Sequence, residues 1–187
     1  KTNHPPPPPL LPPFPINQHP FETNFFLKQA QLFAATNQFH NALASLDKAE
    51  LLEPSEGDIY LIKGSILGSL NNFEEAHQNL QKALELTDSK DEVFYQISGL
   101  YQAQGDYEKA VYYLRKSLEL NMENQDALYE LAFCYDVLDK QEESVAFYLQ
   151  YIDNDPYSYA AWYNLGNAYH KLSQYREAID AYDYAIL

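Results

Sequence analysis

Residues 159–187 read YAAWYNLGNAYHKLSQYREAIDAYDYAIL, and the same succession of large, small and polar residue types occurs 34 residues earlier. Counting back in steps of 34 gives five starting points without an insertion: Thr23, Gly57, Asp91, Gln125 and Tyr159. A fixed period of this length is typical of a stacked repeat protein, in which each unit contacts only its neighbours. The period therefore predicts an array with no single closed core, and binding as the class of function.

Three positions in the period carry most of the pattern. The eighth position holds a small residue in every repeat: Ala30, Gly64, Ser98, Ala132 and Gly166. The twentieth is small as well: Ala42, Ala76, Ala110, Ser144 and Ala178. The eleventh is large: Phe33, Leu67, Tyr101, Tyr135 and Tyr169. Because only small residues let two backbones approach closely, we expect two helices to cross at positions eight and twenty, with large residues at positions four, eleven and twenty-four on the flanks.

The third repeat shows how each unit divides into two helices. Apolar residues recur at three- and four-residue spacing over Glu92–Gln104 and over Tyr107–Leu120, which places one apolar stripe on each helix. Between the two, Gly105 tolerates left-handed backbone geometry and Asp106 is a candidate helix N-cap. The same place in the other repeats is held by Asn37-Gln38, Asn71-Asn72, Asp139-Lys140 and Ser173-Gln174.

Together these residues resemble the tetratricopeptide repeat family. The family signature matches seven residues of the last repeat: Trp162, Leu165, Gly166, Tyr169, Ala178, Tyr182 and Ala185. Pro54 and Pro156 match the proline that closes such a repeat. The resemblance covers residues 23–187 and implies an all-α fold, a right-handed superhelical α-α solenoid of five helical hairpins. The segment Asp155–Gly166 also resembles long bacterial tetratricopeptide proteins of uncertain function.

The period divides the chain into an arm and five repeats. The arm takes residues 1–22, and the repeats take residues 23–56, 57–90, 91–124, 125–158 and 159–187. Nine of the eleven prolines lie in residues 5–20, so we expect an extended arm. Pro20 lies 34 residues before Pro54, so the end of the arm can also be read as the tail of an earlier repeat. The fifth repeat stops inside its second helix, and we expect the middle of a longer array.

The net charge of −15 limits the partners that the chain can have. A surface this negative repels phosphate groups, so we expect neither nucleic acid nor anionic lipid as the main partner. No run of residues reaches the roughly 18 to 20 apolar residues of a membrane span. The single cysteine, Cys134, cannot form a disulfide within the chain and fits a reducing, cytoplasmic compartment, with a removed leader left open.

The family resemblance also implies where a partner binds. First helices of such arrays line a concave groove, and the fifth position, which faces it, is tyrosine in three successive repeats: Tyr95, Tyr129 and Tyr163. The residues expected around this ladder are mainly acids and amides: Glu92, Gln96, Asp126, Glu130, Phe133, Asp136, Asn164, Asn167, His170 and Lys171. We therefore expect a scaffold that binds a protein or peptide of basic or proline-rich character. The alternative is that these rings only fill helix packing, since the chain has 17 tyrosines.

The sequence contains no motif for catalysis, a cofactor or a metal. Its five histidines are scattered without the spacing of metal ligands, and its six glycines form no phosphate-binding loop. We therefore expect a non-enzymatic protein without a cofactor, and two alternatives stay open. One is a self-assembling structural element in which exposed array ends pair between copies. The other is a regulatory or substrate-docking arm of a larger enzyme.

Overall fold

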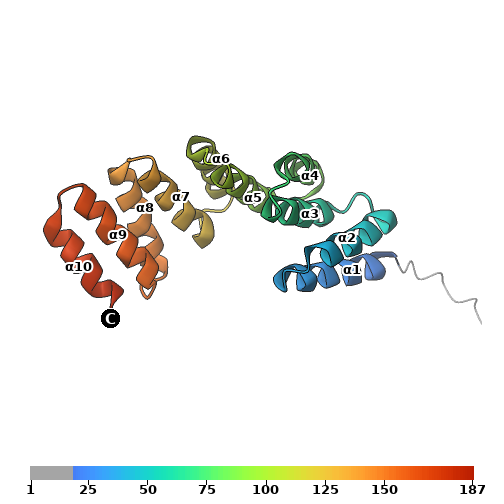
Figure 1. Ribbon diagram of the computed structural model, residues 1–187, viewed down its shortest axis with the longest axis horizontal. Helices are drawn as coiled ribbons and strands as arrows, with labels where there is room; N and C mark the ends of the chain where they lie inside the picture. Colours follow the sequence, from blue (N-terminus) through green and yellow to red (C-terminus); the bar gives the residue numbers. More distant parts are fainter. Residues whose placement is uncertain (1–18) are drawn as a thin grey trace, which may run out of the picture. The chain divides into compact units, whose positions relative to one another are not determined.

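The computed structural model describes residues 19–187, and every regular element in this part of the chain is an α-helix. Short connectors join consecutive helices (Figure 1). The helices are α1 (His19–Ala35), α2 (Phe39–Leu52), α3 (Gly57–Ser69), α4 (Phe73–Leu86), α5 (Lys90–Ala103), α6 (Tyr107–Leu120), α7 (Gln125–Val137), α8 (Gln141–Asn154), α9 (Tyr159–Lys171) and α10 (Tyr175–Ala185). The prediction of an all-α fold made of helical hairpins is confirmed.

The helices belong to two compact units. The first unit, which ends at Pro54, contains α1 and α2, and the second unit, Ser55–Leu187, contains α3 to α10. In both units each odd-numbered helix packs on the helix that follows it. In the second unit, α4, α6 and α8 also pack on the first helix of the next hairpin, as the neighbouring ribbons of α7 to α10 show (Figure 1). Contacts that run from each hairpin to the next define a helical solenoid.

The first helix begins before the predicted first repeat. The proline-rich arm predicted for residues 1–22 lies outside the described residues except for its last four, and these are helical and not extended. Pro20 is compatible with this start because a proline in the first turn of a helix lacks only an N–H that has no intrahelical acceptor. The period alone placed the start of the first repeat at Thr23. In the structure Thr23 is a buried residue within the first two turns of α1.

A left-handed residue ends the first helix of every hairpin. Positive φ angles between 55° and 78° occur at Asn37, Asn71, Gly105, Asp139 and Ser173. In each case the next N–H donates to the carbonyl of the large residue at position eleven, as from Asp106 N to Tyr101 O at 2.9 Å. This is the hydrogen bond of a Schellman turn, which uses a carbonyl that the helix end leaves free. The Asp106 carboxylate also accepts from Lys109 N, so the predicted N-cap is confirmed.

The two helices of a hairpin approach each other closely at the eighth position. This position is buried in all five repeats. A methyl group at Gly64 would lie 2.6 Å from Leu80 Cγ and 3.2 Å from the Ala76 carbonyl oxygen. At Gly166 it would lie 2.5 Å from the Tyr182 ring. The side chain at position twenty-four, Leu80 or Tyr182, therefore lies directly over position eight, whereas the sequence pattern predicted it only on the flank. It does so because it reaches further across the hairpin than the small residue at position twenty.

A second regular contact joins positions four and twenty-six of the hairpins. Lysine ammonium groups lie over aromatic rings in the first three: Lys48 over Phe26 at 5.5 Å, Lys82 over Tyr60 at 3.9 Å and Lys116 over Phe94 at 5.4 Å. The last hairpin stacks Tyr184 on Trp162 instead, at 4.6 Å between ring centroids. Such cation–π pairs contribute roughly 0.5–1 kcal/mol at exposed sites. They join the outer end of the second helix to the first, a pairing that the sequence pattern did not reveal.

We predict opposite effects of Gly→Ala at two helical glycines. Gly64→Ala removes about 1 kcal/mol of glycine helix penalty but forces a methyl group against Leu80, so we expect a net loss of up to about 2 kcal/mol in the free energy of unfolding. Gly99→Ala meets no atom within 4 Å and should stabilise by roughly 0.5–1 kcal/mol. Chemical denaturation measures both variants, and equal stabilisation by the two would contradict the packing at position eight.

Candidate functional site

Two adjacent hollows lie along the first helices of the second unit. The hollow between α3 and α5 has a volume of about 250 Å³ and is lined by Ser65, Gly68, Ser69, Gln96, Gly99, Leu100 and Ala103. The hollow between α5 and α7 has a volume of about 300 Å³ and is lined by Tyr95, Gln96, Ser98, Gly99, Gln102 and Glu130. They share Gln96 and Gly99, so together they form a shallow depression across three first helices.

The charges of three predicted carboxylates act on Tyr95, which lines the second hollow together with Glu130. Burial and the charges of Glu130, Asp126 and Glu92, in that order, raise the pKa of the Tyr95 phenol to about 12. Burial also raises the pKa of the Glu130 carboxyl, with a hydrogen bond from Gln102 opposing and Asp126 adding to the rise. Both shifts report an acidic, partly dehydrated surface that is unfavourable for further negative charge.

The amide side chains near these acids are part of the same cluster. Gln96 Nε2 donates to Glu92 Oε1 at 2.9 Å within α5. Because Gln96 also lines both hollows, this bond links the carboxylate of Glu92 to their shared edge. The structure thus brings together five of the thirteen predicted site residues: Tyr95, Glu92, Gln96, Asp126 and Glu130.

The second tyrosine of the predicted ladder is held by internal contacts. Asn164 Nδ2 on α9 donates to the Tyr129 hydroxyl on α7 at 2.8 Å. The Tyr129 ring meets those of Tyr148 and Tyr151 edge-on, with centroids 5.7 Å and 5.4 Å apart. Burial is the first cause of the raised pKa of the Tyr129 phenol. Tyr129 and Asn164 therefore join the fourth repeat to the fifth.

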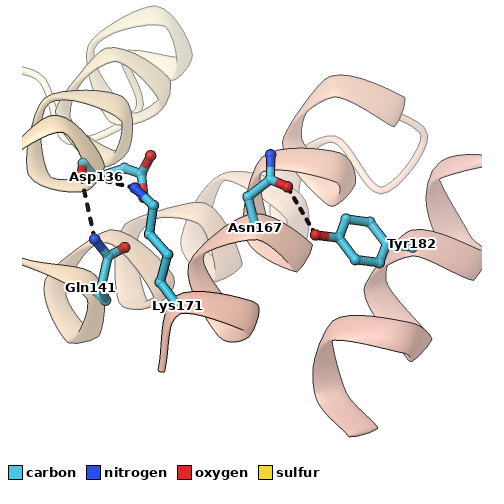
Figure 2. A network of polar contacts seen from close by, with 5 residues as sticks. All are labelled: Asp136, Gln141, Asn167, Lys171 and Tyr182. Atoms are coloured by element: carbon cyan, nitrogen blue, oxygen red, sulfur yellow. Dashed lines mark hydrogen bonds and ion pairs between the residues drawn. The ribbon is translucent and has the colours of Figure 1, made fainter. Parts of the chain in front are cut away.

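An ion pair joins the same two helices further along (Figure 2). Lys171 Nζ lies 3.0 Å from Asp136 Oδ1 and 3.4 Å from the Asp136 carbonyl oxygen, to which Gln141 Nε2 also donates at 3.4 Å. The cation and the acid that were both assigned to the groove thus neutralise each other. Their pairing leaves the net negative charge of the predicted groove concentrated near Tyr95.

The remaining predicted residues have varied surroundings. Asn167 Oδ1 accepts from the Tyr182 hydroxyl at 2.8 Å, which connects α9 to α10 (Figure 2). Tyr163 is exposed, with its ring 5.7 Å from that of Tyr182. Phe133 is exposed at the edge of the Tyr107 ring, and His170 lies against the Tyr175 ring. These four do not form one cluster with the acids around Tyr95.

Sequence reasoning missed the small residues that make the hollows. Gly68 and Gly99 occupy positions twelve and nine of their repeats, and both line the hollow between α3 and α5. A glycine within a helix, away from any turn, is the signal that could have revealed them, because it weakens the helix unless something approaches it closely. Gly68 meets Leu100 closely, whereas the position of Gly99 is open to solvent.

The described residues lack two other kinds of feature. None of their helices combines the length and the apolar character needed to cross a membrane. Their histidine, cysteine, aspartate and glutamate side chains form no group of three that could hold a metal ion. Cys134 is buried, and burial together with the charge of Glu130 raises the pKa of its thiol to about 12, so it stays protonated as a core residue.

The fold and this surface define a helical-repeat protein with a polar face along its first helices. Models of the tetratricopeptide repeat match residues 57–89, 101–153 and 159–187, which together make up more than half of the chain. The chain belongs to the tetratricopeptide repeat family, as its residues had indicated. None of the curated protein sequences compared with the chain matches it.

Solved structures of other tetratricopeptide proteins share this fold. MamA protein superposes with a TM-score of 0.73 at 20% identity, over 88% of this chain and 90% of MamA. PilF of Pseudomonas aeruginosa superposes with a TM-score of 0.82 at 16% identity, over 90% of this chain and 77% of PilF. YrrB, reported as "a TPR protein with an unusual peptide-binding site", superposes with a TM-score of 0.70 at 24% identity, over 91% of each chain. At these identities the likeness shows the fold alone, and it confirms the helical repeat solenoid.

We predict that the hydroxyl of Tyr129 contributes to stability and that of Tyr163 does not. Tyr129→Phe leaves Asn164 Nδ2 without its acceptor and should lower the free energy of unfolding by about 1 kcal/mol. Tyr163→Phe, at an exposed ring, should stay within about 0.5 kcal/mol of the parent. A double-mutant cycle of Tyr129→Phe with Asn164→Ala measures the bond itself, and additive effects would argue that it is absent in solution.

Proposed function

We propose that this tetratricopeptide scaffold binds a peptide segment on its first helices, with a basic side chain of the partner between Glu92, Asp126 and Glu130 beside Tyr95. Tetratricopeptide arrays serve in general as protein-interaction scaffolds. The observation that supports the finer assignment is a hollow lined by Tyr95 and Glu130, at which the charges of Glu130, Asp126 and Glu92 all act on the partly buried tyrosine. Binding, and not catalysis, is the activity that we assign to this surface.

The size of the hollows favours a peptide over a small molecule. Pockets for small molecules commonly measure about 300–1,000 Å³ and enclose most of their ligand. The two hollows, at about 250 Å³ and about 300 Å³, lie at or below that range and are adjacent. Each suits one side chain of a segment that continues from one to the other. The missing side chain at Gly99 lets the backbone of such a segment approach α5 at their shared edge.

The charge of the surface favours a basic residue. A lysine or arginine at Tyr95 would interact with three carboxylates at once and with the face of the phenol ring. Partial burial strengthens these interactions, because they are less screened than pairs in open water. The raised pKa of the Glu130 carboxyl means that its ionised form is destabilised in the free protein. A bound cation would relieve that destabilisation, which is the physical basis of the preference.

Exposed rings further along the first helices suit the neighbouring residues of the same partner. Tyr163 and Phe133 present aromatic surface on α9 and α7. Rings of this kind pack against proline or other apolar side chains, in line with the proline-rich character expected of the ligand. The published description of YrrB as a peptide-binding tetratricopeptide protein supports the class of ligand but not its sequence.

We predict that a peptide array probed with the purified protein will retain arginine- and lysine-containing peptides, and that Glu130→Lys will reduce their affinity by at least about tenfold. Asp153→Lys is the matched control, because it makes the same change in net charge at an exposed position on the second helix α8. Gly99→Phe should block binding without lowering stability, since its side chain enters open space. Equal loss in Glu130→Lys and Asp153→Lys would reduce the effect to net charge and overturn the assigned site.

We predict that binding of a basic peptide weakens in acid. The pKa of Glu130 lies above its usual value in the free protein, so this group takes up a proton earlier than an exposed glutamate as the pH falls. Its charge, and with it part of the attraction, is present above that raised pKa and lost below it. Dissociation constants measured by fluorescence anisotropy between about pH 5 and 7.5 should rise toward acid, and Glu130→Gln should flatten the profile. A profile unchanged by Glu130→Gln would place the titrating group elsewhere.

A further inference from the structure

A further hollow in the second unit lies on its second helices, between α6 and α8 and beside α7. Its volume is about 260 Å³, and it is lined by Arg115, Leu118, Glu119, Met122, Leu131 and Phe147. Four of these six side chains are apolar, and none of the six lines the two hollows near Tyr95. The hollow is therefore a separate surface with a different chemical character.

The apolar walls of this hollow are held in place by the core of the second unit. Leu131 is fully buried in that core, and Leu118 and Phe147 pack against it while remaining partly exposed. The Phe147 ring stacks on that of Tyr135, with centroids 5.6 Å apart and planes inclined by 14°. Because these contacts fix the walls, the hollow presents apolar surface at a defined place.

Met122 is the exposed apolar residue of this hollow. It is 76% exposed and lies in the connector between α6 and α7, at the thirty-second position of its repeat. Pro54 and Pro156 hold that position in two other repeats, and Asp88 holds it in a third. The connector therefore does not require an apolar side chain at this place. A flexible thioether beside an apolar hollow can adapt to the shape of a bound apolar side chain.

The two charged residues of the hollow have opposite signs and lie one helical turn apart on α6. Arg115 Nη1 donates to the Tyr135 hydroxyl at 3.2 Å, which orients the guanidinium. Within residues 19–187 no carboxylate forms an ion pair with Arg115, although the net charge of the chain is −15. Its remaining N–H groups can bind a carboxylate from a partner. Glu119, four residues further along α6, offers a carboxylate to a partner cation.

We propose that this hollow binds a helical segment of a partner protein that presents one large apolar side chain together with an acid and a base on the same face. The apolar side chain enters between Leu118 and Phe147, the acid binds Arg115, and the base binds Glu119. At about 260 Å³ the hollow is smaller than the roughly 300–1,000 Å³ of common small-molecule pockets, so it suits a single side chain. The inference goes beyond the peptide site near Tyr95, because it concerns a second surface and a ligand of different charge.

The spacing and the signs of the two charges select this partner. Residues four apart on a helix lie on one face, as Arg115 and Glu119 do on α6, so a partner helix can present an acid and a base at the same spacing. A segment with acids alone would be repelled by Glu119 and by the net charge of −15. A segment with bases alone would be repelled by Arg115. Packing of an apolar anchor into a groove between helices is a common mode of helix recognition.

The test uses Met122 as a reporter, because it is the single methionine of the chain and a ¹³C-labelled methionine methyl group therefore gives one NMR signal. The probes are alanine-rich helical peptides that carry the pattern Glu-x-x-Leu-Lys, whose three named residues share a helix face. We expect this peptide to shift the Met122 signal saturably. Replacing its leucine by alanine should weaken binding at least about tenfold, and replacing both charges by glutamine about fivefold.

Charge reversal in the protein tests the assigned contacts. Arg115→Glu should weaken the Glu-x-x-Leu-Lys peptide about fivefold and make Lys-x-x-Leu-Lys the better ligand, whereas Arg176→Glu, the matched control at an exposed position of α10, should change neither. Combining Arg115→Glu with Glu119→Arg should restore the original preference, which also shows that the variant is folded.

Three results would overturn the proposal. These are a Met122 signal that no peptide shifts, an equal response to all leucine peptides whatever their charge, and equal effects of Arg115→Glu and Arg176→Glu. Glu130→Lys should leave the Met122 response intact, so failure of this site and failure of the site near Tyr95 are distinguishable.

Discussion

The close approach of two helices at the eighth position of the repeat is the constraint on which the structure depends. Leu80 covers Gly64, and the Tyr182 ring covers Gly166, so these contacts set the distance between the two helices of the hairpin. The left-handed residue at the end of the first helix turns the chain back while the next N–H caps a carbonyl of that helix. The tight helix crossing and the short turn together make each hairpin compact. Its outer surfaces are then free to contact the neighbouring hairpins and binding partners.

The repetition of this unit determines which groups can meet across it. Positions two and six of successive first helices bring Glu92 and Asp126, and with them Glu130, to the same tyrosine. Burial first, and the charge of Asp126 as well, raise the pKa of the Glu130 carboxyl, so the free protein holds charge where it is disfavoured. A surface of this kind is the basis of our proposal that the protein binds a ligand of opposite charge here.

How far the site could be predicted differs from one residue to the next. The residues around Tyr95 were expected from the family resemblance, which implies that these positions of the first helices face one groove, and the period of 34 relates them from one first helix to the next. The hydrogen bond from Asn164 to Tyr129 and the ion pair of Lys171 with Asp136 did not follow. They depend on rotamers and on the distance between α7 and α9, which a periodic pattern does not contain. Glycine does not recur at the position of Gly99 in the other repeats, so the repeat pattern did not single it out. Only the packing of the helices shows that its surroundings are open.

The sequence by itself determined the repeat, its division into two helices, and the left-handed turn between them, because each of these is a local or periodic property written in residue type. It also determined the acidic character of the chain. Only the tertiary structure decided which polar side chains pair with each other and which remain available near Tyr95. It likewise decided that Phe25 stays exposed where the equivalent residues of the other repeats are buried, and Ile179 where the equivalent Val111 and Val145 are partly buried. Exposure is a property of the neighbours that a residue has in space, and identical positions in a repeat can differ in it completely.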